Sequence, residues 1–350
     1  MSGPVVVIGA GLVGASVGMA LTQAGRHVHV TDRVTSHALV AAGLGAGSAE
    51  APDPQQVEVV VVAVPPDALT DVVADALQRY PRAVVTDVGS VKGAVLRTLV
   101  PTPGLERYVG SHPMAGSHRS GPVPADGDLF LDRTWVITPH PTATEAAIQT
   151  VRDLADDCGA VVVEMDPAEH DTAVAAVSHL PHLMSVLTAD RLNDVPASHL
   201  RLAGQGLRDV TRIAGSDPQL WTQILSANAE ALRPQLDAVR TRLDMLIDEL
   251  DTRTALTGVL SSGVRGTRRI PGKHGARAHQ WAQVVVEIPD APGALARLFG
   301  DVQQTGISIE DLQIEHDAVR EVGFLALSVD PAQEELLADT LADHNWDLRA

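Results

Sequence analysis

The chain has 350 residues, which suits two or three domains that each bury a core of their own. Its formal net charge of -18 argues against nucleic acid as a partner, because nucleic-acid binding depends on Lys and Arg at phosphates. The single cysteine, Cys158, cannot form an intrachain disulfide, no signal peptide opens the chain, and every apolar run is shorter than the roughly 20 residues that span a bilayer. We therefore expect a cytoplasmic protein without a membrane segment.

Short valine-rich runs alternate with helix-like stretches from residue 4 to about residue 164. Such continuous apolar strands with helices between them indicate a parallel sheet covered on both faces. The runs are VVVIG, HVHVTD, VEVVVVAVPP, AVVTDVGS, YVGSHP, TWVITP and AVVVEM. We predict an N-terminal doubly wound α/β domain over residues 1–166.

The pattern changes after residue 166. Strand signals disappear and long Ala/Leu-rich segments dominate, so we predict an all-helical domain over residues 167–258. Residues 259–280 combine Gly, Pro and clustered Arg without an apolar period, which indicates a solvated linker, although a nucleotide or partner contact is an alternative. Residues 281–350 read as strand, helix, strand, strand, helix and a possible last strand, which is a small α+β module.

A glycine motif directly follows the first predicted strand. Gly9, Gly11 and Gly14 have the G-x-G-x-x-G spacing of the Rossmann dinucleotide fingerprint, and Asp32 at the end of the second strand is placed to bind an adenosine ribose. The carboxylate favours NAD over NADP, while Arg33 leaves some room for NADP. The alternative is a glycine turn that only packs the first helix. The predicted NAD site comprises Gly9, Ala10, Gly11, Leu12, Val13, Gly14, Asp32, Arg33, Val64, Pro65 and Ser90.

Two polar side chains follow later strands of the same sheet. Ser90 and His112 come after the fourth and fifth strands, and ligands of open parallel sheets bind at these carboxyl ends. A neutral imidazole near a nicotinamide is the usual proton acceptor when a hydride leaves an alcohol carbon. We predict His112 as the general base. The alternative is a histidine that only caps the turn of SHPMAG.

The helical domain carries a histidine pair and an arginine of interest. His179 and His182 share a helix face, which favours a substrate pocket over core histidines or a metal site, since no carboxylate or cysteine set accompanies them. Arg212 precedes a new helix near Asp217, where its guanidinium could hold a substrate carboxylate, the alternative being an ion pair with a core acid. Asp209 is a possible partner of the neighbouring Arg208. Cys158 is expected in the core.

Four motifs behind this fingerprint resemble the prephenate/arogenate dehydrogenases of tyrosine biosynthesis. They are TDVGSVK (86–92), GSHPMAGSHRSG (110–121), AVSHLPH (176–182) and GLRDVTRIAGSDPQLW (206–221), and the resemblance covers about residues 4–255. It implies that ring C4 of prephenate gives a hydride to NAD while the ring carboxylate leaves as CO2, driven by aromatisation.

The resemblance also implies roles for single residues. His112 polarises or deprotonates the C4 hydroxyl, and Ser90 orients it. Arg212 binds a substrate carboxylate, while the pocket is lined by His179, His182 and Trp221. A homodimer through the helical domain is implied as well, with part of the active site buried by dimerisation.

Two positions depart from the family pattern. His118 stands where many members have an acid, and Gln205 stands where many have a glycine; both positions concern substrate recognition. The ammonium of arogenate would prefer a carboxylate, which Asp126 or Asp128 could supply. Because His118 supplies none, we favour prephenate.

The C-terminal module resembles ACT domains, which bind amino-acid effectors at strand-to-helix turns. Its fusion to this enzyme implies feedback by an aromatic amino acid, the alternative being a purely dimerising module. The predicted effector site comprises Asp290, Pro292, Gly293, Leu295, Ile307 and Ser308.

Two other functions compete with this interpretation. The β-hydroxyacid dehydrogenases place a catalytic lysine in their helical domain, but the lysines of this chain are Lys92 and Lys273, both outside that domain. A non-catalytic sensor of nucleotides and amino acids would not require His112, Ser90 and Arg212.

Overall fold

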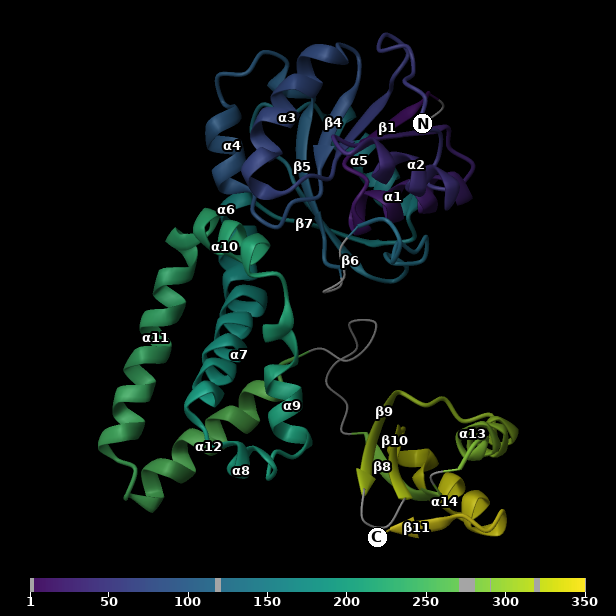
Figure 1. Ribbon diagram of the computed structural model, residues 1–350, viewed down its shortest axis with the longest axis vertical. Coiled ribbons are helices and arrows are strands. Elements are labelled where there is room, and N and C mark those ends of the chain that lie inside the picture. The colour runs from purple at the N-terminus through teal and green to yellow at the C-terminus, as the bar shows by residue number, and fades with distance from the viewer. Residues whose placement is uncertain (1–2, 117–120, 271–280, 290, 318–321, 350) are drawn as a thin grey trace. The chain divides into compact units, whose positions relative to one another are not determined.

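The computed structural model describes residues 3–116, 121–270, 281–289, 291–317 and 322–349. Contacts between residues divide the chain into two units, Met1–Asp244 and Met245–Ala350. Each unit is described by itself (Figure 1).

The first unit begins with a seven-stranded sheet of order β2-β1-β3-β4-β5-β6-β7. Each strand lies within one of the predicted valine-rich runs, so these predictions are confirmed. The strands are β1 (Val5–Ile8), β2 (Val28–Thr31), β3 (Val59–Val62), β4 (Val84–Asp87), β5 (Tyr108–Pro113), β6 (Thr134–Thr138) and β7 (Val161–Glu164).

The sheet differs from the prediction in the direction of its last two strands. β1 to β5 are parallel to one another, whereas β6 runs antiparallel to β5, and β7 is parallel to β6. A parallel connection needs a crossover, which is usually a helix. The described residues between β5 and β6 form turns, while α5 (Glu145–Asp157) links β6 to β7, which explains both directions.

Helices cover both faces of this sheet (Figure 1). Alternate strand residues point to opposite faces, so Val5 and Val7 pack with α1 and α5, while Val6 packs with α3 and α4. The helices are α1 (Leu12–Gln23), α2 (Thr35–Gly43), α3 (Pro66–Arg79), α4 (Gly93–Leu99) and the short η1 (Leu105–Arg107).

The chain after β7 is helical, as predicted. Its first helix, α6, contacts α4, and α10 contacts α3, so this segment packs on the helices beside the sheet. The elements are α6 (Pro167–Val174), the π-helical η2 (Ala175–His179), α7 (Leu180–Asp190), η3 (Arg191–Asp194), α8 (Ala197–Leu200), α9 (Gln205–Thr211), η4 (Arg212–Gly215), α10 (Pro218–Ala227) and α11 (Ala229–Asp248).

One stretch, Pro167–Asp194, has the length and apolar composition of a membrane-crossing helix, a test that core helices of soluble proteins also pass. Its buried side chains include His170, Asp171, His179 and His182. The hydrogen bonds of His170, Asp171 and His179 to other elements fit a folded protein interior better than lipid.

A further helix, α12 (Arg253–Thr267), extends beyond the predicted end of the helical domain at residue 258. The start of the predicted linker is therefore helical. Apolar residues at 256, 259, 260 and 264 follow the spacing of one helix face, which outweighs the three glycines of this helix. Residues 271–280 lie outside the described part of the chain.

The C-terminal module has the predicted order of elements, and its possible last strand is present. Its antiparallel sheet has the order β11-β8-β10-β9, and both helices contribute side chains to one core. The elements are β8 (Ala282–Pro289), α13 (Ala294–Thr305), β9 (Asp311–Asp317), β10 (Val322–Val329), η6 (Pro331–Gln333), α14 (Glu334–Asp343) and β11 (Asp347–Arg349).

Candidate active site

The glycine motif forms a tight turn between β1 and α1. Gly9 has a φ of +105°, and a Cβ there would lie 2.2 Å from the carbonyl oxygen of Ala63. A Cβ on Gly14 would lie 1.9 Å from the carbonyl oxygen of Gly9, so this position needs glycine for close packing. Gly11 faces open space, with nothing within 4 Å of such a Cβ. The turn thus exposes the first N–H groups of α1 to an anionic ligand, such as a pyrophosphate.

Asp32 connects this turn to the end of β2. One carboxylate oxygen accepts a hydrogen bond from the N–H of Ala10 (2.7 Å), and the other accepts one from the N–H of Val34 (2.8 Å). A carboxylate has about four acceptor positions, so ribose hydroxyls can still donate to it. Half-buried Asp32 and exposed Arg33 therefore fit the adenosine end of a dinucleotide.

The remaining predicted cofactor residues surround the same turn or the next loops. Leu12 and Val13 form the first turn of α1, and Val64 lies 3.2 Å from the position of a Cβ on Gly9. Pro65 follows as the exposed N-cap of α3.

Ser90 lies in the loop after β4, where it lines a cavity of about 140 Å³. The cavity is bounded by α3 and α4 and by Ala227 at the end of α10. None of the predicted site histidines lines it. The structure thus places Ser90 at the sheet rim without a direct hydrogen bond to His112 among the described contacts.

A buried lysine fixes the neighbouring ends of β4 and β5. The ammonium of Lys92 is paired with the Asp87 carboxylate and donates to the carbonyl oxygen of Ser111 (2.7 Å). Asp87 also accepts a hydrogen bond from the Tyr108 hydroxyl (2.7 Å). Burial lowers the pKa of the Lys92 ammonium, an effect that Asp87 opposes. This network holds the backbone immediately before His112.

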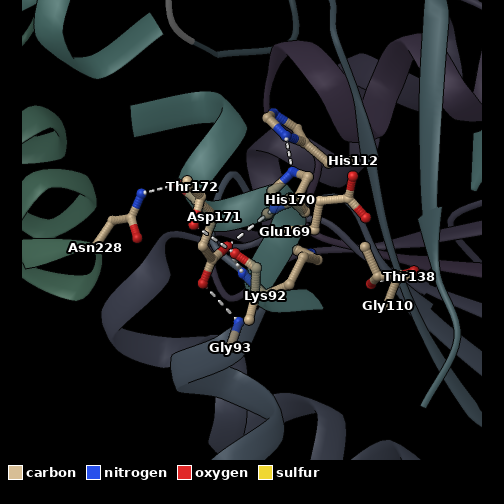
Figure 2. A network of polar contacts seen from close by, with 12 residues as sticks. Lys92, Gly93, Gly110, His112, Thr138, Glu169, His170, Asp171, Thr172 and Asn228 are labelled. Carbon is tan, nitrogen blue, oxygen red and sulfur yellow. Dashed lines mark hydrogen bonds and ion pairs between the residues drawn. The ribbon is translucent and has the colours of Figure 1, made fainter. Parts of the chain in front are cut away.

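His112 contacts His170, which in turn contacts Asp171, and the sequence singled out neither of these two residues. Nδ1 of His112 lies 3.0 Å from Nε2 of His170, and Nδ1 of His170 lies 2.9 Å from Oδ1 of Asp171 (Figure 2). His170 is fully buried and Asp171 is 8% exposed, both on α6. The half-buried His112 therefore stands at the end of a chain of imidazole, imidazole and carboxylate.

Burial holds the pKa of the His112 imidazole well below its usual value, and His170, Lys92 and His179 add to this effect. His112 is therefore neutral at physiological pH. A neutral imidazole has one nitrogen free to accept a proton, which is what a general base requires.

Asp171 joins α6 to the loop that precedes α4. Oδ1 accepts a hydrogen bond from the N–H of Lys92 and Oδ2 accepts one from the N–H of Gly93, both at 2.8 Å (Figure 2). Burial raises the pKa of Asp171, but the hydrogen bonds from His170, Lys92 and Gly93 outweigh it and leave the pKa below its usual value. The carboxylate is therefore ionised.

Three predicted pocket residues come together around an indole ring. The rings of His182 and Trp221 are stacked with centroids 3.5 Å apart, and His179 meets Trp221 edge to face at 6.2 Å. Asn228 lies 3.1 Å from Nδ1 of His179 and donates to the carbonyl oxygen of Asp171 (2.8 Å), which connects this cluster to α6. Burial lowers the pKa of His179 to about 4. Nδ1 of His182 is buried without a hydrogen-bond partner among the described residues.

The other predicted substrate residues lie on α9 and η4, which contact α7. Arg212 is exposed, and no ion pair with a core acid is found for it in the described part of the chain, so that alternative is not supported. Gln205 donates to Asp209 (2.8 Å), and no ion pair between Asp209 and Arg208 is found among the described residues. His118 lies outside the described residues.

The predicted effector residues lie at the ends of α13. Gly293, its N-cap, has a φ of +90°, which favours glycine, and Pro292, Leu295 and Ser308 are exposed. Ile307 lies in the core of the module, because its side chain packs with the other core residues. Asp290 lies outside the described residues.

His170, Asp171 and Asn228 were missed, although the sequence holds a signal for the first two. Pro167, His170, Asp171 and Val174 follow the i, i+3, i+4, i+7 spacing of a buried helix face, and all four are buried. A histidine and an acid in such a stripe require polar partners. Asn228 carries no comparable local signal.

Comparisons with known proteins agree with this geometry. The model of the prephenate dehydrogenase nucleotide-binding domain matches residues 17–164, and that of the prephenate dehydrogenase dimerization domain matches residues 166–256. A probable prephenate dehydrogenase, NovF, from Streptomyces niveus is 32% identical, and the match covers 97% of this chain and 98% of the relative.

Two solved structures share the fold of most of the chain. Prephenate dehydrogenase from Aquifex aeolicus, in complex with hydroxyphenyl propionate and NAD+, is 26% identical with a TM-score of 0.68. Arogenate dehydrogenase from Synechocystis is 27% identical with a TM-score of 0.63. Each match covers 76% of this chain and 98% of the other.

Proposed function

This chain belongs to the prephenate dehydrogenase family, and on that basis we propose that it oxidises prephenate to 4-hydroxyphenylpyruvate and CO2 in tyrosine biosynthesis. It is an NAD-dependent oxidoreductase, as the family match and the related NAD+ complex indicate. The observation that carries the proposal is a neutral His112 on β5, in the same sheet as the turn after β1 that suits the dinucleotide.

When bound at the turn after β1, NAD would supply the acceptor for the hydride that leaves ring C4 of the substrate. The free nitrogen of His112 takes the proton of the C4 hydroxyl as the C–H bond breaks, and Ser90 orients that hydroxyl. The bond between the ring and its carboxylate breaks, its electron pair completes the aromatic ring, and CO2 leaves. The proton returns to the product phenol, so His112 ends the cycle neutral.

The substrate side of the site is assigned to residues of the helical segment. Arg212 supplies an exposed guanidinium for a carboxylate, and His182 offers a buried Nδ1 that has no partner in the described part of the chain. Trp221 and His179 provide aromatic surface beside it, and His118 and Gln205 complete the set.

Prephenate is favoured over arogenate by the relative NovF, which matches nearly the whole chain and is named a probable prephenate dehydrogenase. The similarity to the Synechocystis arogenate dehydrogenase keeps arogenate as the second candidate. The ammonium of arogenate would need a carboxylate partner. Asp126 is a candidate, and a hydrogen bond from its N–H to Ser16 (3.0 Å) holds it beside α1. Steady-state rates with each substrate and with NAD or NADP test the assignment. A larger kcat/KM for arogenate would reverse it.

The C-terminal module is assigned to regulation by an aromatic amino acid. Its elements suit the ACT-like resemblance, and the exposed turn before α13 offers a ligand site. Calorimetric titration of the full chain with phenylalanine, tyrosine and tryptophan tests this assignment. Heat with one of them supports it, whereas no heat with any of them leaves a purely dimerising module.

We assign the chain to a cytoplasmic homodimer. The family model over residues 166–256 is named for dimerization, and Leu243, Ile247, Leu260 and Val264 are exposed on α11 and α12. Sedimentation of the full chain tests the dimer.

Cys158 is a buried free cysteine in the core, which suits a reducing compartment. We propose domains over residues 1–166, 167–258 and 281–350, although α12 continues to Thr267, so the predicted linker 259–280 begins as helix.

A further inference from the structure

The chain from His112 through His170 to Asp171 fixes which nitrogen of each ring carries a proton. The ionised Asp171 can only accept, so the 2.9 Å contact requires an N–H at Nδ1 of His170. A neutral His170 then has a bare Nε2, which accepts from Nδ1–H of His112 across 3.0 Å. The Nε2 of His112 is left without a proton, as the base of the proposed reaction requires.

The carboxylate at the far end is held rigidly. Asp171 accepts from two backbone N–H groups, those of Lys92 and Gly93, and its own carbonyl oxygen accepts from Asn228. Hydrogen-bonded contacts thus lead from the N-terminus of α4 to Asp171, from Asp171 to His170 and from His170 to the His112 ring, while Asn228 holds the backbone of Asp171 from the side (Figure 2). A ring held at both its nitrogen and its backbone has one orientation.

The charges around His112 explain why this support matters. Lys92 and His179 oppose a positive charge on the His112 ring, and so does His170 when it is itself charged. The Asp171 carboxylate is separated from the His112 ring by one imidazole, that of His170. When His112 takes a proton, its Nδ1–H donates more strongly to His170, whose own N–H donates to Asp171.

Resting on the proposed function, we propose that His170 and Asp171 are positioning residues, which fix the tautomer and orientation of His112 and stabilise the charge that His112 gains in the reaction. The arrangement has the logic of an acid that orients a catalytic histidine in a serine hydrolase, with a second imidazole between them.

Two substitutions of His170 separate its contacts. The amide of asparagine lies near the position of a histidine Nδ1, and that of glutamine lies near Nε2. His170→Asn therefore keeps the contact with Asp171 and loses the one with His112, whereas His170→Gln keeps an acceptor for His112. We expect kcat to fall about 10- to 100-fold in His170→Asn with KM within about 3-fold, and about 3- to 10-fold in His170→Gln. Equal kcat values in the two variants, or a His170→Asn kcat within about 2-fold of the unmodified enzyme, would overturn the proposal.

Thr172→Ala is the matched control. Thr172 is exposed on the same helix, and its hydroxyl donates only to the carbonyl oxygen of Ala168 within α6. This variant loses a contact within α6 but leaves the contacts among His112, His170 and Asp171 intact, so its kcat should equal that of the unmodified enzyme. A loss as large as in His170→Asn would assign the effect to α6 stability and overturn the positioning role.

The pH profile gives a second readout. In the proposed state a neutral His170 accepts from Nδ1–H of His112 and so favours the charged form of that ring. His170→Asn removes this acceptor, so the pKa of His112 should fall and the acidic limb of kcat/KM should move to lower pH. A purely structural role would lower the amplitude and leave the limb in place, which counts against the proposal.

A measurement without substrate separates this proposal from the proposed function. Nitrogen-15 NMR of the full chain labelled at histidine, with the His112 signal assigned by its loss in His112→Asn, reports the tautomer. We expect a proton at Nδ1 of His112 and none at Nε2. The opposite tautomer overturns the proposal, even if prephenate is oxidised. If the tautomer is as expected but neither prephenate nor arogenate is oxidised, the proposed function alone fails.

Discussion

The imidazole of His182 lies parallel to the indole of Trp221, with 4° between the ring planes and 3.5 Å between their centroids. His182 comes from α7 and Trp221 from α10, so this stack joins two helices of the proposed substrate pocket. It also fixes the direction of the His182 ring, whose Nδ1 has no partner among the described residues.

Trp221→Leu should therefore weaken substrate binding. Aromatic pairs contribute about 0.5–1.5 kcal/mol beyond burial, so we expect KM for prephenate to rise about 3- to 10-fold while kcat changes less. Trp221→Phe keeps an aromatic face and should raise KM by less than about 2-fold. Steady-state kinetics measure both variants. A Phe variant as impaired as the Leu variant would contradict the role of the stack.

His112→Asn tests the base directly. The variant loses the nitrogen that accepts the substrate proton, so kcat should fall about 10²-fold or more, with a smaller effect on KM. Binding of NADH, measured by fluorescence, should be unchanged and serves as the folding control. An unchanged kcat would remove the base assignment.

Sequence patterns predicted the frame of this site because its signals are local. The valine-rich runs and the Gly9 turn depend on a few adjacent residues, and His112 could be placed at the sheet rim from strand order alone. The reversed direction of β6 was not predicted, since it depends on a connection that lacks a helix in its described residues.

The partner of His112 could not be predicted in the same way. His170 is 58 positions further along the chain, on a helix of the next segment, and the contact forms only when α6 packs against α4. The burial of Ile307, which was assigned to an effector site, is likewise decided by packing in the C-terminal module. Periodicity identified buried faces without identifying which polar groups meet there.

Removal of Lys92 from its buried ion pair with Asp87 should lower the stability of the fold strongly. Lys92 is 1% exposed and Asp87 is fully buried, so Lys92→Met leaves a buried carboxylate without its cation. Removal of one partner of such a pair costs about 3–5 kcal/mol in the free energy of unfolding. Urea denaturation measures the loss. Arg97→Met is the control, because Arg97 and Glu230 are exposed and 4.0 Å apart, and it should cost less than about 1 kcal/mol.

Stability should also fall in mild acid. The pKa of His179 is about 4 in the folded chain and 6.5 in the unfolded chain. Between these values the unfolded state binds a proton that the folded state does not. The stabilising contribution of the neutral His179 is therefore fully present above pH 6.5 and decreases as pH falls toward 4. The contribution of His179 approaches about 3 kcal/mol. Urea midpoints from pH 7 to pH 4 should show this decline, and His179→Gln should reduce its slope. An equal slope in the variant would assign the decline to other groups.

The charge of Asp32 should set the choice of cofactor, because its carboxylate both anchors the N–H groups of Ala10 and Val34 and faces the place of the adenosine ribose. Asp32→Asn keeps the side-chain size but removes the charge that repels a 2′-phosphate. Hydrogen bonds to charged groups contribute about 1.5–3 kcal/mol, so KM for NAD should rise at least about 10-fold, and the ratio of kcat/KM for NADP to that for NAD should rise as well. Arg33→Ala is the control: it leaves the NAD kinetics within about 2-fold, since NAD has no 2′-phosphate for Arg33 to bind. If Asp32→Asn left the NADP to NAD ratio unchanged, the carboxylate would be holding the turn without selecting the cofactor.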